Sequence, residues 1–79
     1  MNADPLKFAL IGCGRIATRH AELLSSGEIA GAKLVGVCDK IAEKAERLST
    51  RYGTRGFTDM HEMAQTVNPD VFVVLTESG

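Results

Sequence analysis

The sequence predicts an α/β fold in which helices flank a parallel sheet. Short apolar segments suited to buried strands alternate with segments of helical periodicity. The first apolar segment, residues 7–11, runs directly into a Gly-x-Gly-x-x-Ala turn, and a helical pattern begins within that turn. Right-handed crossovers between successive strands then predict the strand order 3-2-1-4, with the first strand in the interior of the sheet. We therefore expect a Rossmann-type sheet.

The expected strands cover residues 7–11, 33–39, 54–57 and 70–75. The first two helices are expected at residues 15–25 and 41–52, and each is followed by a glycine suited to a left-handed C-cap. The third opens at Thr58 or Asp59, both of which are good N-cap residues, and stops at Asn68-Pro69. Each of the three expected helices has a predicted apolar face. In chain order these faces comprise Ala17, Ala21 and Leu24; Ile41, Ala45, Leu48 and Tyr52; and Met60, Met63, Ala64 and Val67. The charged residues 43, 44, 46 and 47 are interpreted as a solvated face.

The glycine turn predicts a phosphate-binding loop. Gly12 allows a sharp turn at the end of the strand, and Gly14 leaves the main chain bare for a pyrophosphate. Ala17 is small enough for close packing between helix and strand. The helix start, at Arg15 and Ile16, offers backbone N–H groups and a partial positive charge to the phosphates. The loop therefore favours a dinucleotide as the ligand.

Asp39 closes the second expected strand and lies 22 residues after Ala17. An acidic residue at about this distance binds the adenosine ribose in such folds. A competing interpretation makes Asp39 the N-cap of the next helix, and both roles are compatible. Asp39 repels a 2′-phosphate, whereas the neighbouring Lys40 attracts one. Because Lys40 can turn into water, we expect NAD to be preferred over NADP.

Three other features leave alternatives open. Gly36, inside a strand, marks the close approach of another element or of the cofactor. His20 lies one helical turn from the loop, near enough to approach a phosphate, although such a residue is more often solvated. Cys13 and Cys38 lack metal-binding spacing and are interpreted as buried, reduced thiols, with a metal or redox role as the alternative.

Composition excludes several classes of partner. The 79 residues carry a net charge of −1, which argues against a nucleic-acid surface. No apolar run approaches the roughly 18 residues that a membrane-spanning helix needs. The N-terminal residues lack the basic region of a signal peptide. We therefore expect a cytoplasmic protein with no metal site.

Four segments of the sequence resemble the glucose-fructose oxidoreductase / inositol 2-dehydrogenase family. They are residues 9–17 followed by His20, residues 35–39, residues 57–59 and residues 71–76. The resemblance implies an NAD(P)-binding domain of an enzyme that oxidises or reduces a sugar-type hydroxyl. It places the pyrophosphate at Arg15 and Ile16, the ribose at Asp39 and the nicotinamide at Thr76. The family often has proline after this threonine, whereas this sequence has Glu77.

The same resemblance implies that the catalytic residues lie elsewhere. The family's catalytic lysine stands in a Glu-Lys-Pro motif and its histidine in a C-terminal domain, and neither occurs in this sequence. We therefore expect residues 1–79 to be the N-terminal part of a dinucleotide-binding domain, with residues 71–75 as an exposed apolar sheet edge and the substrate domain absent. The complete enzyme is expected to be a homo-oligomer. The resemblance is nearest to the branch that acts on UDP-linked N-acetylated amino-sugar uronates.

Two other functions share the loop signature. One is a non-enzymatic NAD(H)-sensing regulatory module. The other is a different Rossmann-like enzyme, such as a methyltransferase, that binds another adenosine ligand. Sequence downstream of residue 79 would discriminate between the three classes.

Overall fold

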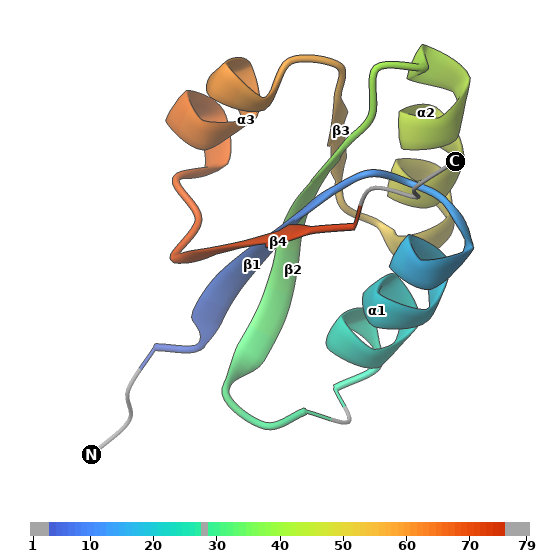
Figure 1. The fold of residues 1–79 in the computed structure, drawn as a ribbon. Helices are drawn as coiled ribbons and strands as arrows, with labels where there is room; N and C mark the ends of the chain where they lie inside the picture. Colours follow the sequence, from blue (N-terminus) through green and yellow to red (C-terminus); the bar gives the residue numbers. More distant parts are fainter. Residues whose placement is uncertain (1–3, 28, 76–79) are drawn as a thin grey trace.

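The computed structural model describes residues 4–27 and 29–75. Along the chain the elements are β1 (Leu6–Ile11), α1 (Arg15–Ser25), β2 (Ala32–Cys38), α2 (Ala42–Tyr52), β3 (Arg55–Phe57), α3 (Met60–Val67) and β4 (Val71–Val74) (Figure 1). All strand pairs are parallel, and the strand order is β3-β2-β1-β4. The predicted topology and the interior position of β1 are therefore confirmed. Among the described residues, none of the helices combines the length and apolar character needed to cross a membrane.

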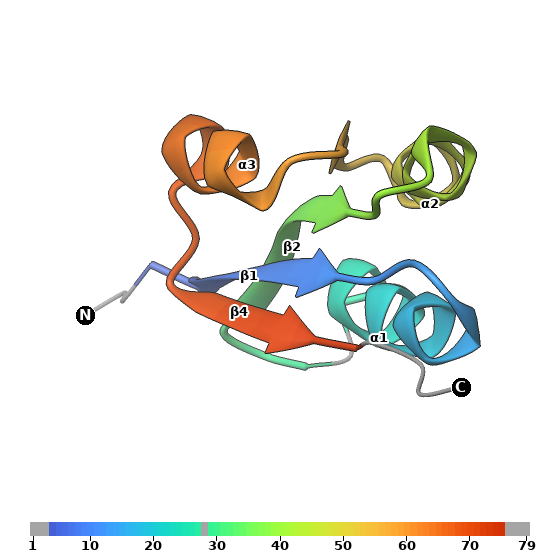
Figure 2. The ribbon, with the colours of Figure 1, turned by 45° about the horizontal axis from the view of Figure 1, so that its top comes forward.

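Helices cover both faces of the sheet. Figure 1 shows α1 and α2 on one side and α3 on the other, and Figure 2 shows the twist of the strands between them. Successive residues of β1 divide between the two layers, because Leu10 packs with α1 and α2 while Ala9 packs with Met63 of α3. Both β1 residues are fully buried. The first strand is thus buried on both faces, as its continuous apolar sequence predicts.

β4 lies at one end of this sheet and is only partly covered. Its Val73 packs against the cluster formed by α1 and α2. Phe72 and Val74 also pair with β1, but their side chains lie on the opposite face of the sheet. These side chains are 43% and 63% exposed. The structure therefore shows the exposed apolar strand that the sequence predicts.

The bounds of α1 agree with the prediction, and those of the other elements differ from it by one or two residues. β2 ends at Cys38, so Asp39 is the first residue beyond the strand instead of its last. α3 begins after Asp59, whose carboxylate accepts a hydrogen bond of 2.8 Å from the His61 N–H. Asp59, and not Thr58, is therefore the N-cap. Asn68 ends this helix in the left-handed conformation, with φ of 44°.

Two residues that were predicted to lie in the core are exposed. Ile41 and Met60 are 53% and 47% exposed, whereas Ala45, Leu48 and Met63 of the same helical faces are buried. The reason is position along the helix axis. Ile41 is the N-cap of α2 and Met60 is the first residue of α3, and both helices begin beyond the carboxyl ends of the strands. The prediction for these two residues is wrong because no sheet lies beneath them.

Gly36 marks the close approach of α3 to β2. A Cβ atom at this position would lie 3.1 Å from Sδ and 3.3 Å from Cγ of Met63, and 3.4 Å from Cγ2 of Val67. Of the two alternatives for Gly36, the structure supports close packing of another element.

We expect Gly36→Val to lower the free energy of unfolding by about 1–3 kcal/mol, because the new side chain overpacks the contact with Met63. Urea denaturation would measure the change. In a double-mutant cycle with Met63→Ala the two substitutions are expected to couple by more than about 0.5 kcal/mol, because the truncated side chain makes room for valine. Strict additivity would contradict this account.

Candidate functional site

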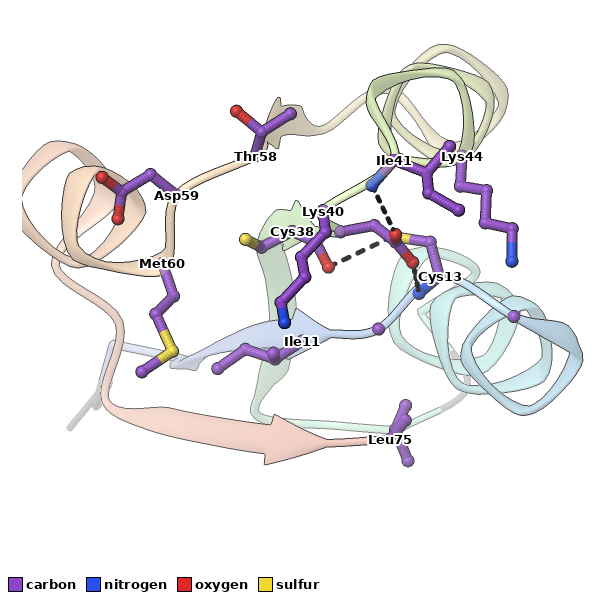
Figure 3. Close-up of a pocket in the computed structure, with 13 residues that line it drawn as sticks. Ile11, Cys13, Cys38, Lys40, Ile41, Lys44, Thr58, Asp59, Met60 and Leu75 are labelled. Carbon is purple, nitrogen blue, oxygen red and sulfur yellow. Dashed lines mark hydrogen bonds between the residues drawn. The ribbon is translucent and has the colours of Figure 1, made fainter. Parts of the chain in front are cut away.

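A cavity of about 810 Å³ opens at the carboxyl ends of β1 and β2 (Figure 3). Its wall consists of residues 11–14, residues 38–41, Lys44, residues 58–60 and Leu75. The volume lies within the range of about 300–1,000 Å³ that is common for small-molecule sites. The strand order reverses direction beside β1, and ligands of open α/β sheets bind at such a point.

The glycine loop forms one side of the cavity. Gly12 has φ of 103°, a conformation that side chains disfavour, and its N–H donates a 2.7 Å hydrogen bond to the carbonyl of Cys38. Gly14 is the N-cap of α1 in an extended conformation and contributes no side-chain hydrogen bond to the helix start. An anion at this place meets bare main chain and the positive end of the α1 dipole.

Asp39 connects the loop to the start of α2. Its Oδ2 atom accepts a 2.8 Å hydrogen bond from the Cys13 N–H, and its Oδ1 atom accepts one of the same length from the Ile41 N–H. The Asp39 N–H in turn donates to the carbonyl of Phe57. Asp39 is not the N-cap of α2, a position that Ile41 occupies, so that alternative is wrong.

The carboxylate of Asp39 retains acceptor capacity after these two bonds. An ionised carboxylate offers about four lone-pair directions, and each oxygen uses one here. The residue also lines the cavity. The geometry therefore suits a ligand with a vicinal diol, because both oxygens can accept from hydroxyl groups.

The predicted site residues are distributed as follows. Gly12, Gly14, Asp39 and Lys40 line the cavity, and Figure 3 shows the side chain of Lys40 extending toward Ile11. Arg15 and Ile16 form the exposed first turn of α1, next to the loop. Thr76 and Glu77 lie outside the described residues. The assignment of these residues to parts of a cofactor stays a prediction.

His20 belongs to the helix and not to the loop. Its Nδ1 atom lies 2.9 Å from the carbonyl oxygen of Ile16, one turn earlier in α1. This contact supports the interpretation of His20 as an ordinary helix residue.

Several residues of the cavity wall were not predicted from the sequence to belong to the site, among them Ile41, Lys44 and Met60. Ile41 and Met60 were assigned to the core, and Lys44 to a solvated face. A signal for Lys44 was present, since the residues three and four positions away on either side are Lys40, Ile41, Arg47 and Leu48. None of these is acidic, so the helix offers Lys44 no partner at the usual spacing.

The two cysteines lie beside the loop as free, buried thiols. Cys13 Sγ donates a weak hydrogen bond of 3.5 Å to the carbonyl oxygen of Cys38. Burial, followed by the negative charge of Asp39, raises the pKa of the Cys13 thiol to about 11. Burial and Asp39 also raise the pKa of Cys38. The thiolate forms are disfavoured, which argues against nucleophilic chemistry by either residue.

This pKa shift predicts a pH dependence of stability. The thiol of Cys13 titrates near 9.0 when unfolded and near 11 when folded. Its contribution to the free energy of unfolding is therefore fully present below pH 9 and lost as the pH rises toward 11, because the unfolded chain releases the proton first. Chemical denaturation at several alkaline pH values would measure it. The variant Cys13→Ala should show a shallower alkaline decline, and an equal decline would contradict the prediction.

Comparison with known proteins identifies the family and agrees with the fold. Residues 6–79 match the model of an oxidoreductase family with an NAD-binding Rossmann fold, GFO_IDH_MocA. The chain belongs to this family. Membership confirms the predicted family resemblance and the predicted NAD-binding Rossmann fold.

Two solved dehydrogenases share this fold, and a third dehydrogenase is similar in sequence. The chain is 32% identical to the WlbA dehydrogenase from Bordetella pertussis, solved with NADH and UDP-GlcNAcA, with a TM-score of 0.82 over 95% of this chain and 23% of that chain. It is also 32% identical to myo-inositol 2-dehydrogenase from Lactobacillus plantarum, with a TM-score of 0.80 over 94% of this chain and 22% of that chain. D-glucoside 3-dehydrogenase from Escherichia coli K12 is 34% identical over an alignment of 76 residues, and the match covers 94% of this chain and 21% of that protein. The chain therefore spans about a fifth of the length of these relatives.

Proposed function

We propose that the protein is an NAD-dependent dehydrogenase that acts on a ring hydroxyl of a sugar, a cyclic polyol or a nucleotide-linked sugar. In this proposal the present chain supplies the cofactor-binding part. The observation that carries it is the hydrogen bond from the Cys13 N–H to Asp39 in the wall of the cavity, which joins a phosphate loop to an acceptor for ribose hydroxyls.

The chain's own residues suit the parts of NAD in a defined order. Backbone N–H groups at Arg15 and Ile16 take the pyrophosphate, and Asp39 takes the adenosine ribose. Thr76 follows β4 in sequence and would line the nicotinamide side. When bound, the nicotinamide ring accepts a hydride from the substrate carbon. Asp39 favours NAD over NADP because its carboxylate repels a 2′-phosphate.

The names of the relatives support the substrate class. An inositol, a glucoside and a UDP-linked sugar share a saturated ring that carries several hydroxyl groups. The predicted branch, dehydrogenases of UDP-linked N-acetylated amino-sugar uronates, is supported by the similarity to WlbA. The inositol dehydrogenase is 32% identical as well, so the substrate panel below includes both classes.

A direct assay tests the proposal. The intact protein is incubated with NAD together with one candidate substrate at a time: myo-inositol, a methyl glucoside or UDP-GlcNAcA. Formation of NADH is followed by its absorbance at 340 nm. Reduction of NAD with at least one of these substrates supports the proposal. If NAD binds but no compound of this class is oxidised, the substrate proposal is wrong. If NAD does not bind, the cofactor assignment of the site is wrong as well.

The relatives named above are all dehydrogenases, which favours catalysis over a purely NAD-sensing role.

We also infer that the protein is cytoplasmic and forms a homo-oligomer. The free thiols Cys13 and Cys38 suit a reducing compartment. Light scattering of the intact protein would determine the number of subunits.

A further inference from the structure

We propose that Lys44 is a phosphate-binding residue of the dinucleotide site and that its ammonium group contacts a phosphate of the cofactor. The inference rests on the proposed function, because it assigns a residue to the same cavity. No motif of the glycine loop or of the Asp39 segment includes this position.

The position of Lys44 is the first observation. It is the third residue of α2, and its backbone N–H donates a 3.0 Å hydrogen bond to the carbonyl of Ile41. This bond anchors the first turn of α2 beside the cavity, which Lys44 lines together with Gly12, Cys13 and Gly14. Figure 3 shows its side chain extending from α2 on the side of the cavity where Cys13 lies, whereas the side chain of Lys40 extends toward Ile11. The two lysines therefore serve different parts of the cavity.

The charge of Lys44 reaches the loop. Burial and the charges of Asp39 and Cys38 raise the pKa of the Cys13 thiol. The positive charge of Lys44 has the opposite effect and lowers this pKa. A positive charge that stabilises an anion at Cys13 also stabilises an anion placed on the main chain next to it.

Helix stability does not explain this lysine. A cation in the first turn of a helix faces the positive end of the helix dipole, which is mildly unfavourable. Arg47, one turn further along α2, is a second cation, and within residues 4–27 and 29–75 no carboxylate forms an ion pair with Lys44. An anionic ligand would remove this unfavourable arrangement.

The dinucleotide offers phosphate in two places. The pyrophosphate lies on the glycine loop in either cofactor, and NADP adds a phosphate on the adenosine ribose. Both are anions that an ammonium group binds as a point charge. Ligands that carry only one of them separate the two sources.

The test measures nucleotide binding to the intact protein by isothermal titration calorimetry at low ionic strength. The probes are NAD, ADP, adenosine 2′-monophosphate and adenosine. Lys44→Gln removes the charge, Lys44→Arg retains it, and Arg47→Gln is the matched control, because Arg47 is an exposed cation on the same helix that does not line the cavity.

We expect Lys44→Gln to weaken phosphate-containing probes by about 3-fold to 10-fold, to leave adenosine unchanged and to flatten the salt dependence of binding. Lys44→Arg should restore the affinity. If Lys44→Gln loses affinity for ADP and NAD, the contact is assigned to the pyrophosphate. If it loses affinity for adenosine 2′-monophosphate alone, the contact is assigned to a 2′-phosphate. An effect no larger than that of Arg47→Gln overturns the inference and leaves the proposed function intact. Failure of the parent protein to bind any probe overturns both.

Discussion

Asp39→Ala is expected to weaken NAD binding by about 30-fold to 1,000-fold, which corresponds to roughly 2–4 kcal/mol. The substitution removes the acceptor for the ribose hydroxyls. It also removes the acceptors of the Cys13 and Ile41 N–H groups, each of which donates at 2.8 Å to a different carboxylate oxygen. The loop and the start of α2 then lose their connection before any cofactor arrives.

Because of this second role, Asp39→Ala should also lower the free energy of unfolding without cofactor, by about 1–2 kcal/mol. Calorimetric titration would measure binding, and urea denaturation without nucleotide would measure stability. Asp39→Asn is the matched variant, since its single carbonyl oxygen retains one acceptor and loses the charge. We expect the free energy of unfolding of Asp39→Asn to lie between those of the parent protein and Asp39→Ala. We also expect this variant to have a smaller preference for NAD over NADP than the parent protein. Unchanged stability of Asp39→Ala would show that the hydrogen bond between Cys13 and Asp39 is not needed to order the loop.

Gly14→Val is expected to weaken NAD binding by at least about 100-fold while leaving the fold intact. Gly14 has φ of −88° and ψ of −159°, a conformation open to any residue, so a side chain brings no backbone strain. The branched side chain instead occupies the space in which a phosphate approaches the main chain. The cost to the free energy of unfolding should stay near 1 kcal/mol, because valine is a poorer N-cap than glycine.

Gly53→Ala provides the opposite control for Gly14→Val. Gly53 ends α2 in the left-handed conformation with φ of 64°, and nothing lies within 4 Å of a Cβ atom placed there. Alanine should therefore cost about 1–2 kcal/mol of stability through strain and leave NAD affinity unchanged. Titration and thermal unfolding of both variants would separate the two effects. Binding of NAD to Gly14→Val with the affinity of the parent would refute the assignment of the loop.

Much of the site could be predicted because its signals are local or follow from topology. The glycine turn is a continuous segment, and Asp39 marks the end of the second strand. Parallel strands with right-handed crossovers bring their carboxyl ends to one edge, so the loop and Asp39 had to be neighbours. The bond between the Cys13 N–H and Asp39 Oδ2 spans 26 residues, and no pattern in the sequence specifies it.

The misassignments of Ile41, Met60 and Lys44 have one common cause. The 3.6-residue period assigns Ile41 and Met60 to the apolar faces of their helices, and it assigns Lys44 to a charged face. Periodicity describes direction around a helix axis but not whether a sheet lies beneath each turn. At the starts of α2 and α3 the sheet has ended, so these side chains line a cavity.

The order of strands and helices, the glycine turn and the position of Asp39 at the end of the second strand could thus be predicted from patterns along the chain and from the handedness of the crossovers. The cavity wall, the packing of Met63 against Gly36 and the two hydrogen bonds that Asp39 accepts depend on the tertiary structure. Such contacts depend on how far each helix extends past the strands, and that distance is set when the helices pack on the two faces of the sheet.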